Sequence, residues 1–229
     1  MLAGRAKAPL DARARLRLRA LGATLFLTMA LPLHAEAPTP QRVIELCARV
    51  ESPAHCGRIV EGEQLKSLPN LATRDGDALT ITLFPSGTRV LVDSIASSNE
   101  RSYALWDYWS AVNAVVLFVT SGDDLSYAIL QRATGDMTTL PAEPVLAPDR
   151  QRLAVADFCS RNCANELTVW RVARGGVRKE LAYRPAAPWS DVTVAWKDGE
   201  TLSVQFTPPG ASESRTQERK LTAPDWQRF

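Results

Sequence analysis

Two stretches in the second half of the chain decide the expected fold: LAPDRQRLAV at residues 146–155 and LTVWRV at residues 167–172. The larger apolar side chains alternate in both, Leu153 with Val155 and Leu167 with Val169. Successive side chains of a strand point to opposite faces of a sheet, so a period of two is typical of β-structure. The two stretches therefore predict two strands.

The same alternation recurs from Ala78 to the end of the chain, and short turns rich in Gly, Asp and Ser separate the strands. Such meanders need only hairpin connections, which predicts antiparallel sheets. No stretch past Val60 is typical of a crossover helix, which argues against an α/β fold. Further strands are expected at residues 79–83, 90–92, 103–105, 115–119, 125–129, 192–194 and 202–206.

A faint repeat runs through this region. Strands that start near Ala78, Ala114, Arg152 and Asp191 are 36, 38 and 39 residues apart. A period near 40 with several strands per unit is typical of β-propeller blades. Residues 146–172 also resemble the "SPDGxxLAV … LxVW" pattern of propeller repeats, such as those of the Tol translocation proteins and of Trp-Asp repeat proteins, with Ala and Arg at positions 147 and 150 in place of the usual Ser and Gly. The resemblance implies a mainly β, small or partial propeller; a β-sandwich is the alternative.

The first 35 residues have the pattern of a cleavable signal peptide. Six basic residues and one acid precede residue 20, and fourteen uncharged, mainly apolar residues follow from Ala20 to Leu33. About twenty such residues are needed to span a bilayer, so the run is too short for an anchor. We expect cleavage near Ala35, export to the periplasm or the medium, and no membrane span in the mature protein.

Removal of this leader changes the charge of the chain. The whole sequence has 27 basic and 25 acidic residues, and removal of six and one leaves 21 against 24. A mildly acidic domain without a cluster of Lys and Arg has no electrostatic footprint for nucleic acid. Nucleic acid is therefore not an expected partner.

Four cysteines follow the leader, and an even number in an oxidising compartment predicts disulfides. Three pairings are possible, and proximity favours Cys47 with Cys56 and Cys159 with Cys163. A zinc site that uses His55 is disfavoured by the spacings, and a redox pair by the lack of C-x-x-C. No metal or other cofactor is expected.

One short amphipathic helix is expected over residues 41–50, with Ser52 and Pro53 ending it and the Cys47–Cys56 bond fixing it to the following turn. The favoured role for this helix is to cover a sheet edge. We thus expect a signal peptide at residues 1–35, a helical, disulfide-bonded segment at residues 36–77, and a β domain of about four units at residues 78–229.

No catalytic constellation is visible. The sequence lacks G-x-S-x-G, and His55 is the one His after the leader, which disfavours a nucleophilic triad. Pairs of turn carboxylates could serve as acid and base, although Asp in turns is ordinarily there to bond the backbone two residues on. The carboxylates in question are Asp75, Asp77, Asp123, Asp124, Asp149, Asp157 and Asp191.

Residues 103–109, YALWDYW, hold four aromatic side chains in seven positions. Alternation sends Asp107 and Trp109 to one face and Trp106 and Tyr108 to the other. If one face is core, Trp106 and Tyr108 form an exposed pair of the kind favoured at binding sites; the alternative is a strand buried on both faces.

The leading hypothesis is therefore an exported binding or protein-interaction module. Its contact surface would be the strand Trp106, Asp107, Tyr108, Trp109 or a sheet end built from loops, and its partner an envelope protein or glycan. The alternatives are a carboxylate-dependent hydrolase of cell-envelope sugars and an inhibitor or accessory subunit of an envelope complex.

Overall fold

The computed structural model describes residues 38–94, 100–159, 163–173 and 175–229. The chain divides into two units, Met1–Pro32 and Leu33–Phe229, and only the second contains described residues. The expected signal peptide at residues 1–35 lies outside the described part.

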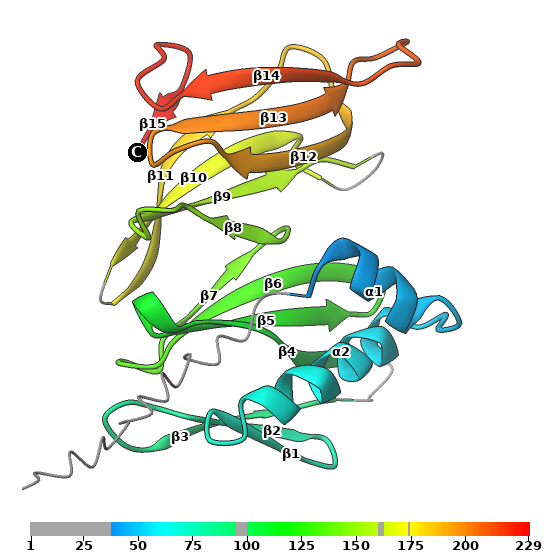
Figure 1. Cartoon of the computed structure of the whole chain (residues 1–229), viewed down its shortest axis with the longest axis vertical. Coiled ribbons are helices and arrows are strands. Elements are labelled where there is room, and N and C mark those ends of the chain that lie inside the picture. Colours follow the sequence, from blue (N-terminus) through cyan, green and yellow to red (C-terminus); the bar gives the residue numbers. More distant parts are fainter. Residues whose placement is uncertain (1–37, 95–99, 160–162, 174) are drawn as a thin grey trace, which may run out of the picture. The chain divides into compact units, whose positions relative to one another are not determined.

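The described chain folds into four antiparallel sheets, which confirms a mainly β, antiparallel fold (Figure 1). Sheet A contains β1 (Ala72–Asp75), β2 (Ala78–Thr82) and β3 (Thr88–Val92). Sheet B contains β4 (Arg101–Trp109), β5 (Ala114–Ser121), β6 (Asp124–Gln131) and β7 (Met137–Leu140), with a 3-10 turn, η1 (Ser110–Val112), between β4 and β5. Sheet C contains β8 (Pro144–Leu146), β9 (Arg152–Asp157), β10 (Glu166–Ala173), β11 (Gly176–Tyr183) and β15 (Gln227–Arg228). Sheet D contains β12 (Ser190–Trp196), β13 (Thr201–Thr207) and β14 (Arg215–Lys220).

Three hydrophobic clusters hold the sheets together. The first joins sheet A to sheet B, the second joins sheet B to sheet C, and the third joins sheet C to sheet D. In β5, Leu117 belongs to the first cluster and its neighbours Val116 and Phe118 to the second. Sheets B and C are thus apolar on both faces, which explains the unbroken apolar run of β5.

The repeat in the sequence has a counterpart in these sheets. The strands that begin near Ala78, Ala114, Arg152 and Asp191 are β2, β5, β9 and β12, one in each sheet. Each cluster joins two sheets that follow one another in the sequence, and within the described residues none joins sheet A to sheet D. A propeller therefore remains a prediction.

Two helices precede the sheets, where the sequence predicted one: α1 (Pro40–Cys47) and α2 (Pro53–Ser67). Ser52 and Pro53 do not end a helix; they begin the second, since Ser52 is its N-cap and accepts the His55 N–H. Helix α2 extends past Val60 to Ser67, but it precedes all of the described strands and is not a crossover helix between them. The buried face of α2 consists of Gly57, Val60, Glu61 and Gln64, so helical spacing is present but only one of the four is a large apolar residue.

Helix α2 lies along β4, the edge strand of sheet B (Figure 1). Gly57 permits the close approach, because a Cβ at this position would lie 2.7 Å from the Phe118 ring. The sequence assigned the covering of a sheet edge to the helix expected at residues 41–50, whereas the helix that lies along the edge strand is α2. None of the described helices is both long and apolar enough to cross a membrane.

The end of the chain returns to sheet C. Strand β15 pairs with β11, with Arg228 opposite Leu181 and Gln227 opposite Ala182. The Phe229 N–H continues the pairing with a bond of 3.0 Å to the Glu180 carbonyl. Because β15 follows sheet D in the sequence, this pairing links sheets C and D.

Candidate functional site

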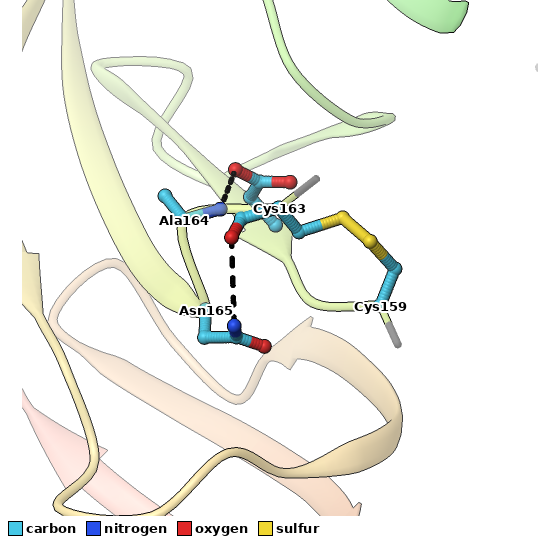
Figure 2. The surroundings of a disulfide bond; sticks show 5 residues. Cys159, Cys163, Ala164 and Asn165 are labelled. Carbon is cyan, nitrogen blue, oxygen red and sulfur yellow. Dashed lines mark hydrogen bonds between the residues drawn. A yellow bond between two sulfur atoms is a disulfide. The ribbon is translucent and has the colours of Figure 1, made fainter. Parts of the chain in front are cut away.

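Both expected disulfides are present, and the described residues contain no free cysteine. Cys47 is the last residue of α1 and Cys56 lies in the first turn of α2, so this bond joins two helices and not a helix to a turn. Cys159 and Cys163 lie in the connection from β9 to β10 (Figure 2). All four cysteines therefore form crosslinks.

The connection around the second disulfide is held by side chains at its base. The Ala164 N–H donates to the Asp157 carboxylate at 3.0 Å, and the Asn165 amide donates to the Cys163 carbonyl at 3.4 Å (Figure 2). Asp157, one of the carboxylates considered for catalysis, is thus occupied in shaping a turn.

The aromatic strand does not present the expected face. Trp106 is 6% exposed and Asp107 is 5% exposed, so the expectation of an exposed Trp106–Tyr108 pair is wrong and the alternative, a strand that packs on both faces, is confirmed. Trp106 is buried because sheet C packs against this face of sheet B. A bulge changes the face of Tyr108, because Leu105 pairs with Leu117 and Asp107 pairs with Val116, which leaves Trp106 as the extra residue. Tyr108 then faces the cluster between sheets A and B, while Trp106 and Trp109 face the cluster between sheets B and C.

Trp106 is a core anchor. Its ring centroid lies 5.4 Å from that of Phe118 and 5.7 Å from that of Tyr127, and its indole N–H donates to Glu143 Oε1 at 2.8 Å. Burial raises the pKa of the Glu143 carboxyl group, and the indole hydrogen bond offsets only part of this rise. Burial, together with the nearby Glu143 carboxylate, also raises the pKa of Tyr127.

A buried ionic network fixes α2 to the edge of β4. Arg74 donates through Nε and Nη2 to the two carboxylate oxygens of Glu61, both at 2.8 Å. The Leu105 N–H donates to Glu61 at 2.9 Å, and the Tyr103 N–H donates to Asp93 at 2.9 Å. The outward N–H groups of an edge strand are thus satisfied by carboxylates. Sequence reasoning missed this network, because no local pattern pairs residues so far apart.

Tyr108 belongs to a second, half-buried polar cluster at the other end of β4. Arg132 Nη1 donates to the Tyr108 hydroxyl and to Asn113 Oδ1, both at 2.9 Å, and the Tyr108 hydroxyl donates to Asn113 Oδ1 at 3.1 Å. Arg132 Nε also donates to the Thr82 carbonyl at 2.7 Å, which ties sheet A to this cluster. Asn113, with a φ of 50°, has the left-handed conformation that ends η1.

Two hollows border this cluster. Tyr108 and Arg132 line the smaller, of about 280 Å³, and Asn113 lines the larger, of about 610 Å³. The larger hollow is mainly apolar, and it includes Phe84, which is 59% exposed. The residues that line the larger hollow are Phe84, Ala111, Val112, Asn113, Gln131, Ala133, Arg150, Gln151, Val172 and Ala173.

The turn carboxylates do not gather into an acid–base site in the described structure. Asp149 accepts the Gln151 N–H at 2.9 Å, the local turn bond expected of Asp. Asp77 and Asp93 share a hollow of about 410 Å³ with His55, but Asp93 is paired with Arg58 at 3.0 Å. No group of three or more His, Cys, Asp or Glu side chains within the described residues is arranged to hold a metal ion.

Neither a protein-family model nor a curated protein matches this chain.

Proposed function

We propose that this protein is an exported protein-interaction module that binds an envelope protein through the larger hollow beside Phe84. The observation that carries the proposal is this hollow of about 610 Å³, lined mainly by apolar residues and flanked by a large exposed aromatic ring. Concave apolar sites with a few polar groups are the usual seats of a partner's anchoring side chain.

The walls of this hollow are held in place before any partner arrives. The Phe84 N–H donates to the Arg132 carbonyl at 2.9 Å, and the Arg132 N–H donates to the Asn113 carbonyl at 3.1 Å. The Gln131 amide donates to the Ala173 carbonyl at 3.4 Å, which joins sheet B to sheet C below the hollow. A preformed surface lowers the entropic cost of association.

Two finer proposals accompany this one. The two disulfides support an oxidising compartment, and hence export. The assignment of one repeat unit to each sheet, and the packing of successive sheets face to face, support an open propeller of four blades.

The test is a quantitative pull-down from an envelope extract with the wild type, Phe84→Ala and Ile44→Ala. Ile44 is 62% exposed on α1 and is the matched control. We expect Phe84→Ala to lose the partner while Ile44→Ala retains it, with both variants as stable as the wild type. Equal recovery by all three proteins would overturn the proposal.

A further inference from the structure

Arg132 is the starting point, because it is a half-buried cation whose partners are all neutral. Five arginines in the described chain are not exposed, and four of them form ion pairs. Those four are Arg58 with Asp93, Arg74 with Glu61, Arg152 with Glu180 and Arg219 with Asp225. Arg132 instead donates to a carbonyl, a hydroxyl and an amide oxygen.

A guanidinium that is partly removed from water ordinarily has a carboxylate partner, since burial of an uncompensated charge is costly. Within the described residues, no carboxylate lies within ion-pair distance of Arg132. The neutral partners fix the guanidinium in position without neutralising it. Arg132 is thus a positive charge that is held in a fixed position and has no carboxylate partner.

This charge opens onto the smaller hollow. No acidic residue lines that hollow, whose lining residues are Ser67, Leu68, Pro69, Asn70, Leu71, Tyr108 and Arg132. The larger hollow has Arg150 at its rim and likewise no acid in its lining. The chain after the leader has more acidic than basic residues. The two hollows have the opposite balance, with two cations and no acid in their linings, so their surface is locally positive.

The hydrogen-bonded cluster brings the two hollows close together. Asn113 lines the larger hollow, and its Oδ1 lies 2.9 Å from Nη1 of Arg132, which lines the smaller one. A ligand that uses both needs an anion and an apolar group only a few ångströms apart. The last residue of a polypeptide has this arrangement, because its α-carboxylate and its side chain share one Cα.

Resting on the proposed function, we infer that the partner segment is a free C-terminus that ends in a large apolar residue. Its carboxylate binds the Arg132 guanidinium in the smaller hollow. Its side chain enters the larger hollow beside Phe84 and Val112. Nε and Nη1 of Arg132 are already bonded, so Nη2, which makes no hydrogen bond to another described residue, is the donor left for the carboxylate.

The test uses fluorescein-labelled peptides of sequence Gly-Ser-Gly-Leu-Phe, with a free or an amidated C-terminus, in anisotropy titrations with the purified protein. We expect the free acid to bind at least tenfold more tightly than the amide. Equal affinities overturn the inference, and so does the absence of binding by the free acid up to about 1 mM, the weak limit of useful affinity. The inference is also overturned if an amidated peptide that carries an internal Glu binds as tightly as the free acid.

Variants locate the site. Arg132→Gln should remove the preference for the free acid, Arg132→Lys should retain part of it, and Arg89→Gln, an equal loss of charge at an exposed site, should leave it unchanged. The acid-against-amide comparison on the wild type decides the question even if Arg132→Gln fails to fold. If the wild type shows no preference for the free acid but still binds a partner that Phe84→Ala loses, only the C-terminus inference is refuted. If the partner is retained by Phe84→Ala, the proposed function is refuted.

Discussion

Removal of the Glu61 carboxylate should destabilise the protein severely. Glu61 is 2% exposed, and it accepts two bonds from Arg74 and one from the Leu105 N–H. Glu61→Ala leaves the Leu105 N–H without its acceptor and removes the nearer carboxylate of the mostly buried Arg74, whose other carboxylate, Asp93, lies 3.7 Å away, so the cost is about 3 kcal/mol, the lower end for breaking a buried pair. Since domains are stable by only about 5–15 kcal/mol, this is about a fifth or more of the total.

Urea unfolding followed by tryptophan fluorescence measures the loss. Glu45→Ala is the matched control, because the Glu45–Arg42 pair is about half exposed on both sides and such pairs contribute about 0–1 kcal/mol. The double variant Glu61→Met/Arg74→Met removes both charges but leaves the Leu105 N–H and the Tyr103 carbonyl without these partners, at about 1–3 kcal/mol each, so it should lose less than the sum of the two single variants. A loss for Glu61→Ala no larger than that for Glu45→Ala would refute the reasoning.

Three further predictions concern titration and crosslinks. Because the folded pKa of Glu143 is raised, its carboxyl stabilises the fold below the unfolded pKa and this contribution disappears as pH rises through the folded value, so Glu143→Gln should gain urea resistance relative to the wild type as pH rises above about 4.5; a constant difference would contradict this. Although burial acts to raise it, hydrogen bonds from Lys179 and Arg184 hold the pKa of Glu166 below its usual value, so the stability lost in Glu166→Gln should be full above about pH 4.5 and should shrink at lower pH in the same assay. Replacement of Cys47 and Cys56 by Ala should cost about 3 kcal/mol and replacement of Cys159 and Cys163 about 2 kcal/mol, as the loop-entropy relation gives for their loop lengths; the reverse order in thermal unfolding would show that strain or residual structure dominates.

Local signals in the sequence predicted local structure well. The alternation of Leu153 and Val155 gave a strand, and Asp149 forms the turn bond that its side chain favours. Both depend only on residues near in sequence, as do the two disulfides across short spacings. The antiparallel sheets follow from the same patterns.

Features that depend on distant residues could not be predicted. The bulge at Trp106 moved Tyr108 and Trp109 to the opposite faces, and no Gly in β4 signals it. Helix α2 carries Glu61 on its buried face, because the partner Arg74 lies on β1 and compensates the charge there. Tyr108 was selected as half of an exposed pair, yet its neighbours in the cluster are Asn113 and Arg132, which no spacing rule connects to it.

The last strand of the chain has a practical consequence for handling this protein. Strand β15 covers part of the outer edge of β11, and a bare edge offers unpaired N–H and C=O groups to other molecules. A truncation before Trp226 would remove β15, and a bulky tag fused directly to Phe229 would disturb its pairing with β11. Either change would expose the edge of β11 and promote self-association. Affinity handles therefore belong ahead of α1, or behind a flexible spacer after Phe229.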